Sequence, residues 1–301
     1  MKAIVLTGYG DVDRLEVRDL SDPKPGPNQI KVCMAGASIN PIDWKLRSGA
    51  FKAMMPLEFP AVLGRDASGE VVEVGPGVTA FKIGDHVMGL AHNCYAEFVV
   101  AGTDAWAVVP ANMDLADAGA LPLVLLTGAQ LVEEAVNPRA RDKLLVTGAT
   151  GSVGRVAVFV AKLRGAKVYA GVRQSQKAEA AKLGADSVVA LDDDREIAGL
   201  AQLDCIADTV GGETIRTLLG KVRPGGTIGS VVGEPPGAKD RGLVVHAMLA
   251  HSDSKRLAEL ARAVAQRELV IPIAKRFPLD QARAAQKMAE AGAGGKVILI
   301  G

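Results

Sequence analysis

The sequence predicts an α/β protein in which a doubly wound parallel sheet is inserted into a discontinuous β-rich domain. Residues 1 to about 110 contain short apolar and β-branched runs, separated by turn-forming segments such as DPKPGPN and KIGD. From about residue 115, strand-like and helix-like segments alternate, which is typical of βαβ units. After about residue 268, the chain returns to short β segments and one helix, much as in its first part.

These observations predict a β-rich domain of residues 1–116 and 269–301, interrupted by an α/β domain of residues 117–268. In the first domain we expect strands at 2–6, 15–20, 29–37, 69–75, 85–90 and 95–101. In the second we expect strands at 143–148, 166–172, 187–191, 204–210 and 226–232, with helices at 152–163, 176–183 and 213–219. One long helix should cover 115–136, and another 252–267, capped by Ser252 or Asp253.

Composition and charge exclude several classes of protein. Hydrophobic residues make up 49% of the 301 residues, which is enough for a large core. A formal net charge of +1 gives no field that would attract nucleic acid or an acidic membrane. The three cysteines lie far apart, and apolar runs such as ALPLVLL are too short to span a bilayer. We therefore expect a soluble cytoplasmic protein that binds neither nucleic acid nor membrane.

The segment TGATGSVG, residues 147–154, is predicted to form a turn between a strand and a helix. In dinucleotide-binding proteins such glycines allow a tight turn, a close approach of the backbone to pyrophosphate, and close packing of the helix. We expect Gly151, Ser152, Val153 and Gly154 to bind the cofactor's phosphates at the helix N-terminus. The alternative is purely steric, since any tight turn from a strand into a helix favours glycine.

The second strand of the α/β domain carries information about the cofactor. NAD-binding proteins usually place an acid about 20 residues beyond the glycines, where it binds the ribose hydroxyls. Residues 167–177 contain no acid, and Arg173, Ser175 and Lys177 follow the strand instead. Cations and a hydroxyl suit the 2′-phosphate of NADPH, so we predict NADPH as the cofactor. The alternative is an ordinary solvated start of a helix.

Two families of reductase share this type of glycine turn. Short-chain reductases use a Tyr-x-x-x-Lys pair, but none of the three tyrosines here is followed by lysine four residues later. The segment GEVVEVGPGVTAFKIGDHVMG, residues 69–89, resembles the signature of the medium-chain dehydrogenase/reductase family. NPIDWKLRSG (40–49), PAVLGRDASG (60–69), DTVGG (208–212) and GKVIL (295–299) extend the resemblance over nearly the whole chain. It implies a GroES-like domain interrupted by a Rossmann domain.

Within that family, the chain resembles the zinc-independent branch. Zinc alcohol dehydrogenases carry a cysteine and a Gly-His-Glu motif where this chain has Asn40 and Gly64-Arg65-Asp66. Three scattered cysteines cannot form a four-cysteine structural zinc site. We therefore expect no metal, and a similarity to NADPH:quinone oxidoreductases and alkenal/enone reductases.

That branch implies hydride transfer from NADPH to a quinone or to the β-carbon of an enone. Without a metal, hydrogen-bond donors must meet the charge that develops on the substrate oxygen. The resemblance places Asn40 near the nicotinamide as an amide donor, Lys45 facing the site, and Thr127 beside the nicotinamide ribose. The alternatives are a turn cap for Asn40, a surface position for Lys45, and a carbonyl-bonded helix-interior threonine for Thr127.

The remaining expectations concern the sheet edge, the rival functions and the oligomer. Val210, Val232 and Gly233 should lie at the carboxyl edge of the parallel sheet and contact the cofactor through their backbone. Two other functions stay open: enoyl-thioester reduction on the same scaffold, and a non-catalytic NADPH-binding or redox-sensing module. Relatives often pair through the edge strand of the Rossmann sheet, so the resemblance also implies a homodimer.

Overall fold

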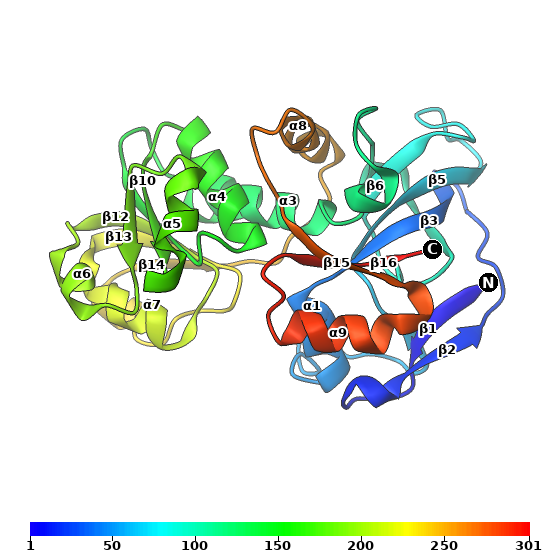
Figure 1. Ribbon diagram of the computed structural model, residues 1–301, viewed down its shortest axis with the longest axis horizontal. Coiled ribbons are helices and arrows are strands. Elements are labelled where there is room, and N and C mark those ends of the chain that lie inside the picture. The colour runs from blue at the N-terminus through cyan, green and yellow to red at the C-terminus, as the bar shows by residue number, and fades with distance from the viewer. The chain divides into compact units, whose positions relative to one another are not determined.

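The computed structural model describes all 301 residues of the chain. It divides into two compact units (Figure 1). The first unit comprises Met1–Leu123 and Ser252–Gly301, and the second comprises Val124–His251. The chain therefore leaves the first unit once and returns to it, and each unit is described separately below.

The predicted domain boundaries at 116/117 and 268/269 need correction, because the segments 117–123 and 252–268 belong to the first unit. Local hydrogen bonds give the reason. The backbone N–H of Leu123 donates to the buried Asp66 carboxylate at 3.1 Å. The Asn112 amide donates to the Ala265 carbonyl at 3.1 Å, at the end of the predicted helix 252–267. Domain boundaries predicted only from the change in sequence pattern cannot take such long-range contacts into account.

The first unit is built on two β-sheets and four α-helices. The larger sheet has the order β15-β16-β3-β5-β6-β8, with β7 also paired to β3. Its strands are Gln29–Ile39 (β3), Asp66–Val74 (β5), His86–Leu90 (β6), Phe98–Gly102 (β7), Trp106–Val108 (β8), Ile273–Pro278 (β15) and Lys296–Ile300 (β16). The smaller sheet contains Lys2–Leu6 (β1), Leu15–Asp19 (β2) and Ala61–Val62 (β4). The helices are Pro41–Ser48 (α1), Leu115–Ala118 (α2), Ser254–Ala265 (α8) and Ala282–Glu290 (α9).

Alternation of apolar residues along these strands fills one core. The fully buried side chains include Tyr95 and Trp106 together with apolar residues of β1, β3 and β16. Helix α9 closes one side of this core and lies beside α1 and β16 (Figure 1). The C-terminal strand β16 pairs with β3 in antiparallel register, Val297 opposite Ile39. The two ends of the sequence thus build one unit.

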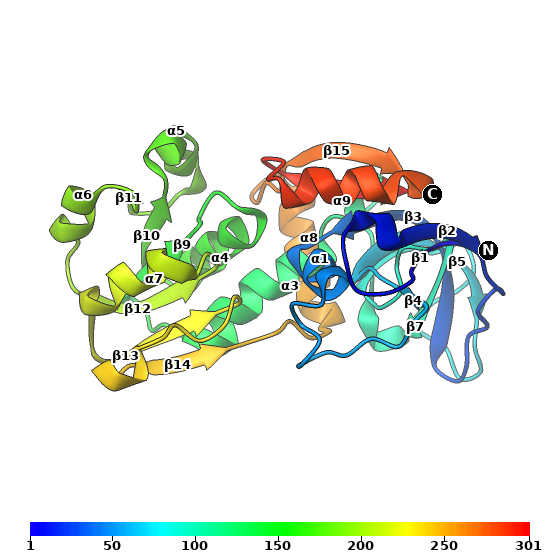
Figure 2. The same ribbon diagram turned by 90° about the horizontal axis from the view of Figure 1, so that it is seen from below.

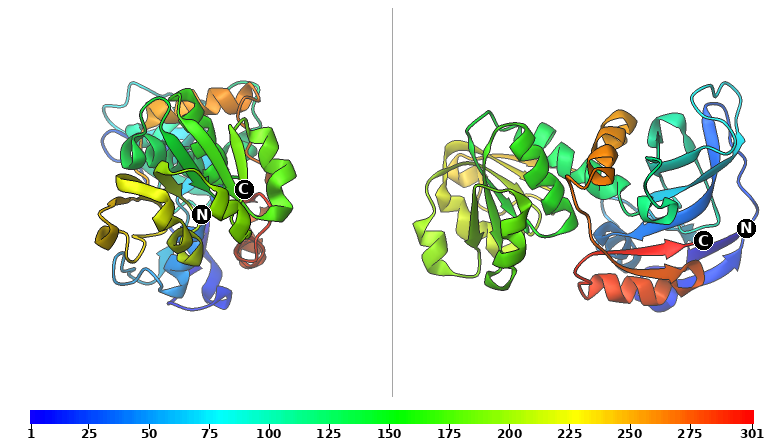
Figure 3. Two further views of the ribbon diagram at one scale, coloured as in Figure 1. Left: turned by 90° about the vertical axis from the view of Figure 1, so that its left-hand side faces the viewer. Right: turned by 45° about the horizontal axis from the view of Figure 1, so that its top comes forward.

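The second unit is a six-stranded, all-parallel sheet with the order β11-β10-β9-β12-β13-β14. Its strands are Lys143–Thr147 (β9), Lys167–Val172 (β10), Ser187–Ala190 (β11), Leu203–Asp208 (β12), Val222–Ser230 (β13) and Val244–Ala247 (β14). Its helices include Ser152–Leu163 (α4), Lys177–Ala180 (α5), Asp194–Gly199 (α6) and Gly212–Leu218 (α7). The strand order reverses direction between β9 and β12, and helices cover both faces of the sheet (Figure 3). Sheets of this kind bind ligands outside the carboxyl ends of their strands, at the point of reversal.

The predicted helix 115–136 is interrupted. It consists of α2, of α3 (Pro122–Gln130) and of a π-helical turn, Leu131–Val136. A Cβ atom on Gly119 would stand 2.3 Å from the Gly36 carbonyl oxygen, so the chain touches β3 here and restarts with Pro122 as the first helical residue. By length and composition this segment could cross a membrane, contrary to the expectation that no apolar run is long enough. However, 72% of its most apolar window is buried inside the protein, as in a core helix.

The predicted fold class is confirmed. Helix α4 has the predicted bounds, and α8 is capped by Asp253, one of the two expected caps. Helices α1 and α6 were not predicted, because eight and six residues are too few to show helical periodicity. The expected homodimer and the cytoplasmic location stay predictions.

Candidate active site and cofactor-binding edge

Helix α1 carries the NPIDWKLRSG motif, and most of that motif builds the helix itself. Asn40 is the N-cap and Pro41 occupies the first helical position, where its missing N–H costs nothing. The Asp43 carboxylate accepts the backbone N–H of Asn40 at 2.7 Å, which is half of a capping box. Gly49 ends the helix in the left-handed conformation, with φ of 80°. These cap signals, rather than periodicity, could have revealed the helix from the sequence.

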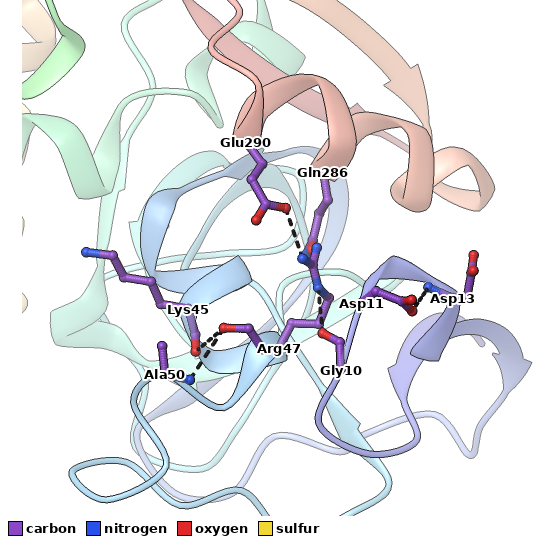
Figure 4. Close-up of polar contacts among 9 residues, drawn as sticks. Gly10, Asp11, Asp13, Lys45, Arg47, Ala50, Gln286 and Glu290 are labelled. Carbon is purple, nitrogen blue, oxygen red and sulfur yellow. Dashed lines mark hydrogen bonds and ion pairs between the residues drawn. The ribbon is translucent and has the colours of Figure 1, made fainter.

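Arg47 fastens α1 to the rest of the first unit (Figure 4). Its guanidinium is buried and donates to Gln286 Oε1 at 2.6 Å and to Glu290 Oε2 at 2.9 Å, both on α9. Its Nε donates to the Gly10 carbonyl at 3.3 Å. A planar group with several donors suits such a three-way junction. Arg47 therefore fixes where α1 lies and is fully used by the protein.

Asn40 is the centre of a buried polar cluster in the first unit. Its Nδ2 donates to Ser38 Oγ and to Asp66 Oδ1, both at 3.0 Å. Its Oδ1 accepts the Lys296 ammonium at 2.6 Å, which fixes the orientation of the amide. Asn40 is 1% exposed, and both of its amide hydrogens are engaged by the protein. This geometry leaves no free donor for a substrate, so Asn40 positions its neighbours rather than acting as the expected amide donor.

Two carboxylates and one ammonium share this cluster away from solvent. Burial raises the pKa of Asp43 to about 7, and hydrogen bonds from Tyr95 and from the Asn40 backbone oppose that rise. Burial also raises the pKa of Asp66, against the attraction of Lys296. The pKa of Lys296 is lowered, because burial disfavours its charge more than the two carboxylates favour it. Sequence analysis did not single out Lys296, although the GKVIL segment contains it.

Lys45 differs from the other motif residues because the protein leaves its ammonium free. The Nζ atom makes no ion pair or hydrogen bond within the chain and lies 5.2 Å from the centre of the Phe51 ring. Its side chain points away from the Arg47 junction (Figure 4). Its backbone carbonyl accepts the Ser48 hydroxyl at 3.2 Å and the Phe51 N–H at 3.4 Å, which leaves the ammonium uninvolved. Lys45 is thus a half-buried cation that remains available to a ligand.

In the second unit, the glycine turn after β9 has the shape of a phosphate-binding loop. A Cβ atom on Gly154 would stand 2.1 Å from the Gly148 carbonyl oxygen, so packing of α4 on the turn requires glycine there. Gly148 itself has φ of 62°. Gly151 is the exposed N-cap. A Cβ atom added there would have only the Gly148 carbonyl oxygen within 4 Å, at 3.2 Å. The steric alternative therefore accounts for Gly148 and Gly154 but much less for Gly151.

The backbone N–H groups at the start of α4 are open to a ligand. The first intrahelical bond runs from the N–H of Arg155 to the Gly151 carbonyl at 2.9 Å. The N–H groups of Ser152, Val153 and Gly154 precede it and have no acceptor in the helix. Three such donors at the positive end of a helix form a ready anion site. The structure therefore brings the predicted phosphate-binding residues together at one helix terminus.

Asp208, which sequence analysis did not single out, ties the carboxyl ends of β9, β12 and β13 together. Its fully buried carboxylate accepts the Thr147 hydroxyl at 2.8 Å and the Ser230 hydroxyl at 3.0 Å. It also accepts the backbone N–H groups of Val210 at 3.2 Å and Gly211 at 3.0 Å. One carboxylate thus fixes the loops that leave three adjacent strands. The polar end of an otherwise apolar strand, DCIAD, was the available signal.

Val210 and Val232 form an exposed apolar rim at this edge. They are 48% and 38% exposed, although valine is usually buried. Their backbone N–H groups are already bonded, to Asp208 Oδ1 and Ser230 Oγ, so a cofactor would meet their side chains or carbonyls. Gly233 follows with φ of 112° and open space beside its Cα. The contact with the cofactor that is predicted for the backbone of these valines would therefore have to use their carbonyls, and it stays a prediction.

Thr127 lies on α3 where that helix touches α4. A Cβ atom on the neighbouring Gly128 would stand 2.5 Å from Val156 Cβ and 2.8 Å from the Val153 carbonyl oxygen. Thr127 is 9% exposed, and its hydroxyl donates to no carbonyl in the chain. The alternative of a carbonyl-bonded threonine is thus not found, and the hydroxyl makes no hydrogen bond within the chain.

The residues predicted to read the 2′-phosphate differ in availability. Arg173 directly follows β10 and is exposed, and its guanidinium has no partner in the chain. Ser175 is also exposed. The Lys177 ammonium, in contrast, is paired with Glu196 Oε1 at 2.5 Å. The free cation of the predicted set is therefore Arg173, and sequence analysis missed Glu196 because it follows the next strand.

Comparison with known proteins agrees with this architecture. Residues 26–117 match the model of the alcohol dehydrogenase GroES-like domain, and residues 183–299 match that of zinc-binding dehydrogenases. The quinone oxidoreductase of Coxiella burnetii is 30% identical with a TM-score of 0.89, over 100% of this chain and 99% of that chain. A mycobacterial protein solved in complex with NADPH is 28% identical with a TM-score of 0.85, over 100% of both chains.

A chloroplastic quinone-oxidoreductase homolog of Spinacia oleracea is 34% identical over 199 residues, which are 63% of this chain and 60% of that protein. A chloroplast envelope homolog of Arabidopsis thaliana also matches over 60% of its length. The chain thus matches only about three fifths of the length of these curated relatives.

The residues around Asn40 do not fit the metal that the name of the second family model suggests. No group of three or more His, Cys, Asp or Glu side chains is arranged to hold an ion. The cation beside Asn40 is the ammonium of Lys296. The nearest thiol, Cys94, is fully buried, and burial raises its pKa well above its usual value, so it keeps its proton. The electrostatic balance of the cluster is therefore met within the chain.

The raised pKa of Asp43, about 7, gives a pH dependence of stability. Between pH ~4 and pH ~7 the folded state holds a proton that the unfolded state releases. The contribution of Asp43 to the free energy of unfolding is therefore fully present below pH ~4 and declines as the pH rises to about 7. Relative to Asp43→Asn, the wild-type protein should lose up to ~1.4 kcal/mol per pH unit over this range, measured by urea unfolding. Parallel pH profiles for the two proteins would contradict the buried, protonated carboxyl.

The glycine turn gives a second test, in which two similar substitutions should differ. Gly154→Ala places a methyl group 2.1 Å from the Gly148 oxygen and should destabilise the protein by roughly 1–3 kcal/mol. Gly151→Ala meets only one atom, at 3.2 Å, and should change thermal stability little. It should nevertheless weaken NADPH binding roughly tenfold, because the methyl group blocks the approach of phosphate. Fluorescence titration measures the affinity, and an unchanged value for Gly151→Ala would argue for the steric alternative.

Proposed function

Because the chain belongs to the medium-chain dehydrogenase/reductase family, we propose that it is an NADPH-dependent oxidoreductase that acts on quinones or α,β-unsaturated carbonyls without a metal. The observation that carries this proposal is the open N-terminus of α4, where three backbone donors follow Gly151 at the carboxyl edge of a doubly wound sheet. The similarity to the Coxiella burnetii quinone oxidoreductase over the whole chain supports the substrate class.

The second unit would hold the cofactor. The N–H groups at the start of α4 would bind its pyrophosphate, and the free guanidinium of Arg173 would meet the 2′-phosphate. Val210, Val232 and the open space at Gly233 would border it on the apolar side. Bound NADPH supplies the hydride, and the protein supplies position and exclusion of water.

In the first unit, Lys45 is the residue we assign to the substrate. Asn40, Asp43, Arg47 and Gly49 are all used to build or anchor α1, whereas the Lys45 ammonium has no partner. A free cation can donate a hydrogen bond to the carbonyl or quinone oxygen, where negative charge grows as hydride arrives. The cluster of Asn40, Asp66 and Lys296 holds the start of the helix that presents Lys45.

A substrate panel tests the activity and the role of Lys45 together. The purified protein should oxidise NADPH with 1,4-benzoquinone or a short enone, and a chelator should leave the rate unchanged. Lys45→Met should lower kcat by roughly ten- to a hundredfold, the range for loss of one donor to a developing oxyanion. Lys52→Met, which removes an exposed lysine just beyond α1, should have no effect.

Each other outcome of the panel points elsewhere. Turnover of an enoyl thioester alone would favour the acyl-thioester reductase. Tight NADPH binding with no turnover of any acceptor would favour a non-catalytic binding module. Loss of activity with a chelator would contradict the metal-free mechanism.

The cofactor assignment has its own test. Arg173→Ala should raise the Michaelis constant for NADPH roughly tenfold and leave that for NADH nearly unchanged, since only NADPH carries the 2′-phosphate. Lys177→Ala should have a smaller effect, because Glu196 already pairs with that ammonium. Equal effects of Arg173→Ala on both cofactors would show that Arg173 does not read the 2′-phosphate.

A further inference from the structure

Charged side chains from two successive strand–helix segments lie together at one end of the sheet of the second unit. Strand β10 leads into α5, and the neighbouring strand β11 leads into α6 (Figure 2). The β10–α5 segment carries the cations Arg173 and Lys177. The β11–α6 segment carries the carboxylates of Asp192 and Glu196. The two segments are linked by hydrogen bonds from Lys177 to Glu196 and from Gln174 to Asp192. The two cations must therefore be considered together with the two carboxylates.

Glu196 is held firmly in this arrangement. Its Oε2 accepts the backbone N–H of Ala190 at 2.8 Å, at the end of β11, and its Oε1 meets the Lys177 ammonium at 2.5 Å. The same two hydrogen bonds, with the backbone bond first, lower the pKa of Glu196, so the carboxylate is charged at neutral pH. The pair is partly shielded from water, with 34% and 29% of the two side chains exposed. Lys177 is therefore a neutralised cation before any ligand arrives.

A second carboxylate, that of Asp192, lies beside the loop that carries Arg173. Asp192 Oδ1 accepts the backbone N–H of Gln174 at 2.7 Å, one residue after Arg173. Asp192 follows β11, the third strand of this unit along the chain, and so differs from the acid that NAD-binding proteins carry after the second strand. Two cations and two carboxylates thus share the place where the 2′-phosphate is expected. Arg173 alone among these four side chains lacks a partner in the chain.

We propose that Glu196 is a specificity-determining residue for the cofactor: by pairing with Lys177 it withholds that ammonium from the 2′-phosphate and so limits the preference for NADPH over NADH. This inference rests on the proposed function, since it requires a dinucleotide at the α4 terminus. Arg173 then carries the attraction for the 2′-phosphate, while Lys177 contributes only when its partner is removed. The physical reason is that two opposite charges in contact present almost no net charge to a third group.

Binding of two nucleotide fragments to the full-length protein tests this directly. Adenosine 2′,5′-bisphosphate and 5′-AMP differ only in the 2′-phosphate, and calorimetry measures both affinities without turnover. Glu196→Gln keeps an oxygen to accept the Ala190 N–H but removes the charge that faces Lys177. We expect it to tighten binding of the bisphosphate roughly three- to tenfold, the effect of one partly screened charge. Binding of 5′-AMP should stay within about twofold.

Two further variants separate pairing from a general change of charge. Asp194→Asn removes the same charge two residues away, from an exposed side chain without a partner, and should leave bisphosphate binding within about twofold. In Lys177→Met/Glu196→Gln the gain should vanish, because the released ammonium is absent. Thermal unfolding of each variant confirms that the fold is intact.

Several outcomes would overturn the inference. These are no gain in Glu196→Gln, an equal gain in Asp194→Asn, or a gain that persists without Lys177. The proposed cofactor has a separate readout in the wild-type protein. Equal binding of the two fragments by wild type would contradict an NADPH preference, whereas the response of Glu196→Gln still decides the role of Glu196. Wild-type protein that binds neither fragment would overturn both.

Discussion

The first unit depends on placing a carboxylate where water cannot reach it. Asp66 is 0% exposed and sits at the first residue of β5. Its oxygens accept the Ser38 hydroxyl at 2.7 Å, the Asn40 amide at 3.0 Å and the Leu123 backbone N–H at 3.1 Å. An unpaired buried carboxylate would be prohibitively unfavourable, so these donors must all be present at once. That requirement fixes the end of β3, the cap of α1 and the start of α3 relative to one another.

The second unit solves the same problem with a different set of donors. Asp208 is fully buried at the end of β12 and is satisfied by two hydroxyls and two backbone N–H groups. No ammonium takes part, because loops that bend around a carboxylate can supply enough donors themselves. In both units the polar cluster lies at strand ends. The two carboxylates Asp66 and Asp208, each with both oxygens hydrogen-bonded, thus hold these strand ends rigidly.

Much of the architecture could be predicted because local patterns carry it. The strand and helix alternation, the mid-chain glycine turn and the bounds of α4 all follow from periodicity and turn chemistry over short windows. Contacts between residues far apart in the sequence could not be predicted in this way. The Lys177–Glu196 contact joins residues 19 apart, and the Asn40–Lys296 contact joins residues 256 apart. Each one changes the role expected for a named residue, since a cation or amide that looks free along the chain is already bonded in the fold. Lys45 and Arg173 keep their expected availability because no distant partner reaches them.

The placement of Lys296 on the last strand has a consequence for the order of synthesis. The second unit is one continuous segment, Val124–His251, so it can fold as soon as that segment has left the ribosome. The first unit must wait, because Asn40 and Asp66 receive their balancing ammonium only when β16 emerges at residues 296–300. Until then the early strands carry a buried acid without its cation. We expect the first half of the nascent chain to stay loosely packed until β16 pairs with β3.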